Sequence, residues 1–516
     1  MTKNKMKAGN SNKEQAVEKA FPPFHLFTFS LFFVAVFLFF GLAYPHHLHY
    51  QEQYQLFLFD SNYVWEIVKH PGGLADLLGR FCTQFFLFAW VGAFVIALLL
   101  SVVQLLTLRL TIDHLPLTID HSVAQGKYDQ RSMVNGQWSM FNGLSFVPSF
   151  LLWLFLLDEN ALLGGVWAVL LTQLAIWGLV RLPDGWVRRI LMIVAFVILY
   201  WIAFGGSHYY RYPNVFPTLL YAAWFSAIII PLVMWFIVRG RKPENAQQQN
   251  NSLTIPEQSS PTRSHSHLIP LTSFVLVSVV MGTLVWKNAN FKAEKVMQYD
   301  FMARYQQWNR ILETINTEKP NNQIGVTVQN LALAMRGMLL EHMFDYNQNG
   351  IAGLLPDVKE DATSPLPTAE AFYQLGMINV AQRTVFEAQE AILDFQKSGR
   401  CYQRLAQTNL INGQYEVARK YLTALQKTLF YREWANETLQ LLSNEQAISK
   451  HPEYGRLRQM AYKEDCYFSD HVTSEMLESL YSNNKDNRLA YQYLLAYYLL
   501  TGDRESFNHF MSRNNE

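Results

Sequence analysis

Seven long apolar runs without charged residues occupy most of the first 290 positions of this 516-residue chain. A helix needs about 20 apolar residues to cross the hydrocarbon core of a bilayer. Most of the runs reach that length, and the run at 190–206 lies at the lower limit. The pattern therefore predicts seven transmembrane helices, at residues 21–44, 81–108, 138–157, 161–180, 190–206, 215–238 and 268–286.

Lys and Arg residues between the runs predict the orientation, because they are enriched on the cytoplasmic side of a membrane. With a cytoplasmic N-terminus, the inner tail and loops hold 15 Lys and Arg residues and the outer loops hold three. An odd number of crossings then places everything after residue 286 outside the cytoplasm. We expect a multi-pass protein of the inner (cytoplasmic) membrane with a periplasmic C-terminal domain.

The domain plan follows from these runs. Residues 240–267 are polar, rich in Gln, Asn and Ser, and contain three prolines, which predicts a disordered cytoplasmic linker. The predicted parts are a cytoplasmic tail, a six-helix membrane region, the linker, a seventh helix and a C-terminal domain, at residues 1–20, 21–239, 240–267, 268–286 and 287–516.

The C-terminal domain is predicted to be helical throughout, because apolar residues recur at i, i+3, i+4 and i+7. Two stretches have the pattern of helix pairs, with Gly413 and Gly502 at their turns and Tyr415 opening one second helix. They resemble tetratricopeptide repeats, at 401–427 and 489–510 and more weakly at 369–393. The resemblance implies an all-α solenoid that binds a peptide or protein; the alternative is a folded appendage of the membrane region.

The outer loop at 45–80 carries the densest set of chemically active side chains. It contains His46, His47 and His49, then Glu52 and Asp60. The periodicity after these residues predicts two short amphipathic helices along the outer membrane surface, joined by a sharp turn at 70–73.

This plan resembles the C-type superfamily of integral-membrane glycosyltransferases, in which an acidic residue stands near the start of the first outer loop. Glu52 matches that position, and His70-Pro71 resembles the His-Pro that opens the second juxtamembrane helix. Outer repeats after such a domain also resemble eukaryotic protein O-mannosyltransferases. The resemblance implies sugar transfer from a polyprenyl-linked donor, with Glu52 and Asp60 as catalytic carboxylates and a divalent metal ion as a candidate cofactor. The paired Asp-Glu signature of the superfamily is absent.

A second outer loop, at 205–217, supplies the candidate substrate-binding residues. Arg211 is its one basic residue, and a guanidinium fork suits a donor phosphate. His208 stands beside it, His70 lies in the other outer loop, and Tyr209 and Tyr210 suit stacking on a sugar.

Other interpretations stay open for these residues. The second loop also fits an interfacial aromatic belt with a snorkelling Arg. The two carboxylates fit solvated interfacial groups that cap short helices. The three histidines fit interfacial polar residues better than a metal site, because HHLH lacks a helical i, i+4 pair.

Several functional classes receive little support. Residues 345–350 match half of an EF-hand loop, but Pro356 stands where a bidentate Glu is needed, so we predict a turn. Cys401 and Cys466 fit either a disulfide or buried thiols. No phosphate-cradling Gly loop, GxSxG or HExxH occurs. The net charge of +1 gives no sign of a nucleic-acid-binding protein.

The chain as a whole resembles an uncharacterised family of polytopic membrane proteins from Bacteroidota, through YPHHLHYQEQYQLF and PGGLADLLG. That family implies no function. Two functions stay open. The first is a glycosyltransferase whose repeats hold an extracytoplasmic acceptor such as a protein. The alternative is a non-catalytic membrane-anchored scaffold whose repeats recruit envelope proteins. A transporter is disfavoured, because the apolar runs contain almost no ionisable residues.

Overall fold

The structure is a computed structural model, and every regular element in its described residues is a helix. The all-α prediction is therefore confirmed for this part of the chain. The predicted tail and most of the predicted linker lie outside it. The described residues are 23–112, 143–182, 185–204, 209–212, 214–240, 268–357, 364–392, 396–462 and 473–514.

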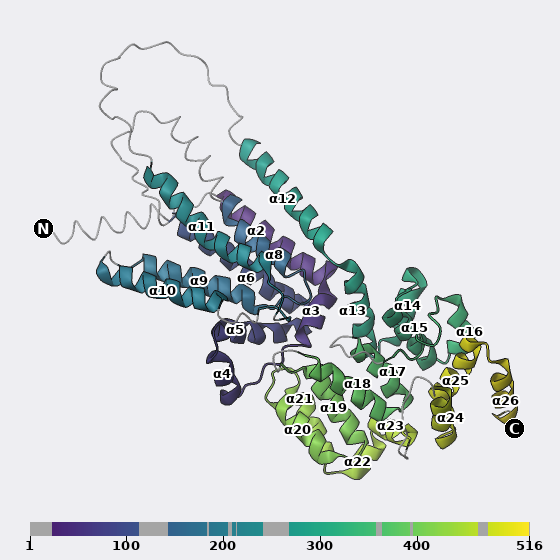
Figure 1. The fold of residues 1–516 in the computed structure, drawn as a ribbon. Helices are drawn as coiled ribbons and strands as arrows, with labels where there is room; N and C mark the ends of the chain where they lie inside the picture. Colours follow the sequence, from purple (N-terminus) through teal and green to yellow (C-terminus); the bar gives the residue numbers. More distant parts are fainter. Residues whose placement is uncertain are drawn as a thin grey trace, which may run out of the picture. The chain divides into compact units, whose positions relative to one another are not determined.

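The chain forms two compact units (Figure 1). The N-terminal unit comprises Met1–Ala43, Ile67–Cys82 and Trp90–Asn290. The C-terminal unit contains Phe291–Glu516 and two further segments, Tyr44–Glu66 and Thr83–Ala89. Much of the predicted outer loop therefore folds with the C-terminal half of the chain.

The helices of the N-terminal unit occupy the predicted apolar runs, one run after another, except α5, which lies mainly in the predicted outer loop. They are α2 (Pro23–Leu38), the π-helix η1 (Phe39–Ala43), α5 (Gly73–Thr83), α6 (Ala89–Ile112), α8 (Val147–Phe155), α9 (Gly164–Val180), α10 (Trp186–Phe204), α11 (Thr218–Gly240) and α12 (Leu268–Asn288).

Two stretches of the described residues are long and apolar enough to cross a membrane, Leu26–Ala43 and Ala89–Thr111. Three further apolar helical stretches are shorter, at Gly143–Phe155, Gly164–Val180 and Thr218–Met234. The structure thus points to membrane association, and a seven-helix topology stays a prediction.

Polar side chains tie the apolar helices together. Trp224 on α11 donates a hydrogen bond to Thr172 on α9 (2.9 Å), and Gln173 on α9 donates to Thr107 on α6 (2.7 Å). Ser149 on α8 donates to a backbone carbonyl of α6 (2.8 Å). Such bonds between apolar helices are typical of helix association in a lipid environment.

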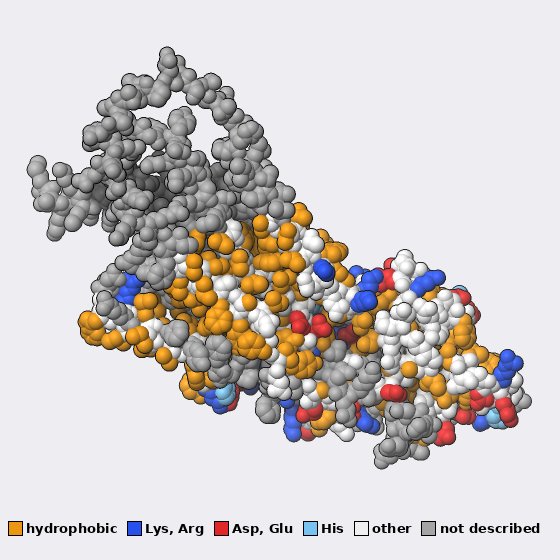
Figure 2. Space-filling model, turned by 45° about the horizontal axis from the view of Figure 1, so that its top comes forward, with side chains coloured by type: hydrophobic (Ala, Val, Ile, Leu, Met, Phe, Trp, Pro, Cys, Tyr) orange, Lys and Arg blue, Asp and Glu red, His pale blue; other side chains and the backbone are white. Residues whose placement is uncertain are grey.

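Large apolar side chains cover much of the outside of this unit. Figure 2 shows a wide hydrophobic area over its helices and a mixture of charged, polar and apolar side chains over the helices of the C-terminal unit. On α10 the exposed side chains include Trp186 (74%), Ile193 (65%) and Val197 (59%). Patches of this kind are unfavourable in water, and they fit a surface that contacts lipid.

The C-terminal unit combines short helices from the outer loop with a long series from the second half of the chain. Its elements are α3 (Pro45–Glu52), α4 (Ser61–Val68), the 3-10 helix η2 (Gln84–Leu87), α13 (Phe291–Arg304), α14 (Trp308–Glu318), α15 (Gln323–Met335), α16 (Leu339–His342), the 3-10 helix η3 (Met343–Asp345), α17 (Pro365–Leu375), α18 (Ile378–Glu390), α19 (Gly399–Ile411), α20 (Tyr415–Gln426), α21 (Arg432–Leu441), α22 (Glu445–Lys450), α23 (Tyr454–Met460), α24 (Thr473–Asn483), α25 (Arg488–Thr501) and α26 (Arg504–Asn514).

Glycines in the left-handed conformation end the first helix of three helix pairs. Gly376, Gly413 and Gly502 have φ values of 92°, 75° and 73°. They separate α17 from α18, α19 from α20, and α25 from α26, and the helices within each pair pack on one another. The structure therefore confirms the three predicted helix pairs and the two predicted turn glycines. Glycine suits these turns because it adopts the left-handed conformation without a steric penalty.

We expect alanine at these turns to destabilise the C-terminal unit to different degrees. A left-handed non-glycine residue costs about 1–2 kcal/mol, and at Gly413 a new Cβ would meet nothing within 4 Å. At Gly376 it would also lie 3.0 Å from Cβ of Met460. Hydrogen exchange of peptides from α17 to α20 should therefore show a larger loss of protection for Gly376→Ala than for Gly413→Ala. Equal losses would contradict the Met460 contact.

Candidate functional site

The candidate residues of the first outer loop begin in α3. A carboxylate from another helix binds the N-terminal end of α3. The N-cap residue Tyr44 makes no side-chain capping bond. Instead, Glu294 on α13 accepts the backbone N–H groups of His46 (2.7 Å) and His47 (2.8 Å). A helix start leaves such donors without an intrahelical partner, so Glu294 caps α3. Burial raises the pKa of Glu294 to about 7, although both N–H groups favour its charged form.

Glu52, the predicted catalytic residue, is the last residue of α3 and is buried (5% exposed). Tyr431 donates its hydroxyl to Glu52 Oε1 (2.8 Å), and Arg304 Nη1 lies 3.7 Å from Glu52 Oε2. Burial raises the pKa of Glu52, and the Arg304 guanidinium opposes that shift. The alternative of a solvated interfacial carboxylate is wrong for Glu52, because α13 and the α20–α21 connection enclose it.

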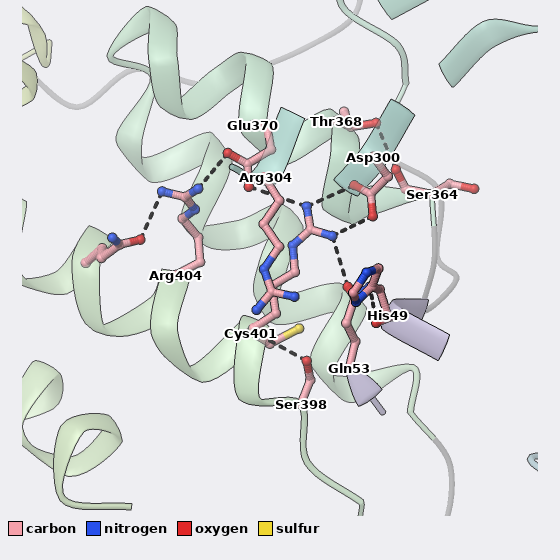
Figure 3. Close-up of polar contacts among 12 residues, drawn as sticks. His49, Gln53, Asp300, Arg304, Ser364, Thr368, Glu370, Ser398, Cys401 and Arg404 are labelled. Carbon is pink, nitrogen blue, oxygen red and sulfur yellow. Dashed lines mark hydrogen bonds and ion pairs between the residues drawn. The ribbon is translucent and has the colours of Figure 1, made fainter. Parts of the chain in front are cut away.

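A second set of charges continues from this pair (Figure 3). Arg400 on α19 binds both carboxylate oxygens of Asp300 on α13, at 2.6 and 2.9 Å, and donates to Gln53 (2.9 Å). Glu370 on α17 lies between Arg400 (3.4 Å) and Arg404 (2.6 Å). Gln53 follows Glu52 in the chain and thereby links the two sets, which we name together the buried polar cluster; it comprises Glu52, Gln53, Asp300, Arg304, Glu370, Arg400 and Arg404.

The buried polar cluster is balanced internally. Three guanidinium groups face three carboxylates, so the cluster has no net charge when all six are ionised. Burying an unbalanced charge costs several kcal/mol, which explains why the groups are matched. Each carboxylate is already engaged by an arginine, and the arrangement is suited to holding helices α3, α13, α17 and α19 together.

Residues after α3 continue as an irregular segment that is bonded to the C-terminal helices and their connections. The Leu56 N–H donates to the carbonyl of Lys397 (2.9 Å), and the Phe59 N–H donates to the carbonyl of Lys427 (2.7 Å). Gln53 binds Arg400 at the start of the segment. The C-terminal unit thus holds a stretch of the chain's own outer loop by side-chain and backbone bonds.

The three histidines lie in the interior of the C-terminal unit. His47 is fully buried, and the His49 ring stacks on Phe301 with a centroid distance of 4.3 Å. Burial lowers the pKa of His46 to about 4 and that of His49 to about 3. Their interpretation as interfacial polar residues is wrong, since α13 covers them. In the described part of the chain, no group of three or more His, Cys, Asp or Glu side chains is placed to hold a metal ion.

Asp60 combines a capping role with an ion pair. Its Oδ1 accepts the N–H groups of Asn62 (3.0 Å) and Tyr63 (3.2 Å) at the start of α4, as the capping interpretation predicts. Its Oδ2 lies 2.5 Å from Nζ of Lys427. The Lys427 side chain lowers the pKa of Asp60, so the carboxylate is charged at neutral pH.

The predicted substrate-binding residues belong to the N-terminal unit. Arg211 is buried, its N–H donates to the carbonyl of Asn160 (2.9 Å), and the Tyr209 carbonyl accepts the N–H of Leu162 (3.0 Å). The Tyr210 hydroxyl donates to Asp158 (2.7 Å). The second outer loop is therefore tied to residues 158–162 of the same unit.

Two other predicted residues do not join this arrangement. His70 is exposed in the turn between α4 and α5, where Gly72 has a φ of 73°. This confirms the predicted helix–turn–helix of the outer loop. His208 lies outside the described residues, as does Cys466. Glu52 and Asp60 fold in one unit, and Arg211, Tyr209, Tyr210 and His70 in the other.

A cavity of about 190 Å³ opens in the C-terminal unit between α13, α15 and α17. It is smaller than the about 300–1,000 Å³ that is common for small-molecule sites. Its size suits one large side chain of a bound polypeptide better than a cofactor. The lining residues are Val296, Asn322, Gln323, Ile324, Thr327, Pro356, Asp357, Ser364, Pro367 and Thr368.

The EF-hand-like stretch is a turn, as predicted. Asn347 donates to the carbonyls of Lys319 (3.0 Å) and Pro320 (3.2 Å), and Asn349 donates to that of Asn321 (3.2 Å). Its amide groups therefore hold the α14–α15 connection. The Cys401 thiol is buried, and burial raises its pKa to about 11.

Sequence reasoning missed most members of the buried polar cluster. Arg400 and Arg404 stand four residues apart on α19, on either side of the buried Cys401, and Glu370 interrupts the apolar run of α17. Charged residues at otherwise apolar helix positions were the available signal, because charges are rarely fully buried unless they are paired.

Comparison with known proteins identifies one relationship. The chain matches a family described as a family of unknown function (DUF6057), over residues 20–208 and 203–516. Searches of curated proteins and of solved structures found no match.

Proposed function

We propose that this chain, which belongs to the family of unknown function DUF6057, is a non-catalytic scaffold of the inner membrane. The seven predicted helices anchor it with the N-terminus in the cytoplasm. The C-terminal unit, a tetratricopeptide-like solenoid in this proposal, faces the periplasm and binds envelope polypeptides there.

The observation that carries this proposal is the engagement of Glu52. A general base must reach the proton that it removes from its substrate. Glu52 is buried, its Oε1 accepts the Tyr431 hydroxyl, and its Oε2 pairs with Arg304. These contacts support a role in attaching α3 to the C-terminal helices, and the burial of the carboxylate separates it from an acceptor hydroxyl in the solvent.

Two observations support polypeptide binding. The C-terminal unit already binds a non-helical stretch of its own outer loop through the N–H groups of Leu56 and Phe59. The cavity between α13, α15 and α17 has apolar walls at Val296, Ile324 and Pro367. Burial of one apolar side chain contributes about 1.5–3 kcal/mol, which suits a pocket that recognises one residue of a partner.

The first test separates the scaffold from a transferase that uses Glu52. The gene is deleted and complemented with wild type or with Glu52→Gln, which keeps the shape of the side chain and removes its charge. Envelope glycoproteins are profiled by mass spectrometry. We expect the same glycans in all strains. The scaffold would be refuted if deletion removes a glycan, wild type restores it, and a normally expressed Glu52→Gln protein does not.

The second test addresses the cavity. We expect Val296→Trp to fill the cavity and to abolish crosslinks between the full-length protein and its envelope partners in formaldehyde-treated cells. The matched control is Val417→Trp, at an exposed position of α20 (39% exposed). It should leave the crosslinks unchanged. The same loss in both variants, or in neither, would count against the cavity as the recognition pocket.

A transferase remains the second candidate because of one feature of the N-terminal unit. Asp158 is half-buried and binds the Tyr210 hydroxyl, and the backbones of Arg211 and Tyr209 are bonded next to it. An accessible carboxylate beside tyrosines and an arginine suits sugar phosphate chemistry better than Glu52 does. This candidate predicts that Glu52→Gln restores a glycan lost on deletion, whereas Asp158→Asn does not.

A further inference from the structure

Exposed and half-buried apolar side chains gather where the α20–α21 loop meets η2 and Phe88, all within the C-terminal unit. Phe430, in the connection between α20 and α21, packs edge-on against Phe85 and Phe88, with centroid distances of 5.7 and 5.2 Å. The adjacent Leu429 is 41% exposed and Phe88 is 50% exposed. We name Phe85, Phe88, Leu429 and Phe430 the aromatic tip. Such a group is unfavourable in water and indicates a contact surface.

Chain connectivity fixes what lies next to the aromatic tip. Phe88 directly precedes α6, whose stretch Ala89–Thr111 is long and apolar enough to cross a membrane. In the proposed anchoring α6 crosses the bilayer. Because consecutive Cα atoms are about 3.8 Å apart, Phe88 then lies at the depth where that helix leaves the bilayer. Because Phe430 packs on Phe88, the α20–α21 loop shares this depth.

The side chains around the aromatic tip also fit a bilayer surface. Aromatic residues are enriched at membrane–water interfaces, and basic residues there face phosphate head groups. Lys427 and Arg432, on either side of Leu429 and Phe430, are both exposed. Lys427 also binds Asp60 at the start of α4, a helix in which no residue is buried and Trp65 is 67% exposed.

We propose that the aromatic tip is a phospholipid contact of the C-terminal unit, with Leu429 and Phe430 inserted at the boundary between head groups and acyl chains. The inference rests on the membrane anchoring in the proposed function and adds a residue-level site to it. Its consequence is that a loop more than 300 positions after α6 helps to hold the C-terminal unit at the membrane surface.

Photocrosslinking in the full-length protein tests this site. p-Benzoylphenylalanine replaces Leu429, and the protein is placed in nanodiscs of phosphatidylethanolamine and phosphatidylglycerol. After irradiation, mass spectrometry identifies the adducts. The matched control replaces Phe344, which is 61% exposed elsewhere in the C-terminal unit, and a reference probe replaces Phe94 on α6, which is 49% exposed. We expect phospholipid adducts at 429 and 94, with a yield several times that at 344.

The outcomes distinguish the two levels of the proposal. A lipid yield at 429 no higher than at 344, with a strong signal at 94, would overturn the lipid contact and leave the anchoring intact. Crosslinks from 429 to a polypeptide in cells would identify a protein as the occupant and also overturn it. No lipid adduct at either 94 or 429 would overturn the anchoring itself. A second probe at Phe88 should repeat the result of 429.

Discussion

Replacement of Arg400 by Met should destabilise the C-terminal unit by about 3–5 kcal/mol, since removal of one partner leaves buried charge unpaired. Arg400 is 4% exposed and neutralises Asp300 and part of Glu370, and it also binds Gln53. Met fills much of the same volume without a charge. Hydrogen exchange of peptides from α19, measured on the full-length protein in nanodiscs, should be faster by about two to four orders of magnitude, because about 1.4 kcal/mol corresponds to a factor of ten.

Two variants establish that the loss comes from unpaired charge. Asp300→Asn in the Arg400→Met background should recover part of the stability, because the carboxylate left without its arginine is then neutral. The Arg383 side chain is 63% exposed and pairs with Glu387 at the surface. Arg383→Met breaks this pair and should change stability by no more than about 0.5 kcal/mol. An Arg400→Met protein with wild-type exchange would show that the cluster contributes little.

Local patterns predicted the elements of the fold well. The apolar runs each contain a helix, and Gly413 and Gly502 end helices as their spacing predicts. These features depend on contacts within one or two turns of the chain, which a sequence displays directly. The ends of the elements followed from the same signals, since glycine favours the left-handed conformation.

The candidate site could not be predicted in the same way. Glu52 binds Tyr431 across 379 positions, and His46 binds Glu294 across 248. Nothing in the local pattern of residues 45–60 indicates that they fold with helices so far along the chain. The sequence showed that this loop was rich in titratable groups. Whether those groups face water, lipid or other charges depends on tertiary packing, and here packing paired Glu52 with an arginine.

The C-terminal unit should also lose stability in mild acid, and two histidines are the cause. Folding keeps His46 and His49 neutral, with pKa values of about 4 and about 3 against an ordinary value of 6.5. Burial is the main cause, and the nearby Arg310 and Arg304 add to it. The unfolded chain therefore binds more protons below pH 6.5, and stability falls as the pH falls. Between pH 7 and pH 5 each histidine removes about 2 kcal/mol.

Glu294 opposes this loss, and variants at both sites should reveal the balance. Its pKa of about 7 exceeds the ordinary value of 4.5, so as the pH falls the folded state binds a proton at a higher pH than the unfolded chain does. This proton uptake increases the free energy of unfolding by about 2 kcal/mol between pH 7 and pH 5. These three groups together should thus cost wild type about 2 kcal/mol between pH 7 and pH 5. His49→Phe, which preserves the stack on Phe301, should abolish most of that loss, whereas Glu294→Gln should about double it.

Hydrogen exchange of α13 and α19, corrected for the intrinsic rate at each pH, measures how stability changes with pH in each variant. The exposed His509 provides the control: if His509→Phe flattens the slope as much as His49→Phe does, buried histidines are not its cause.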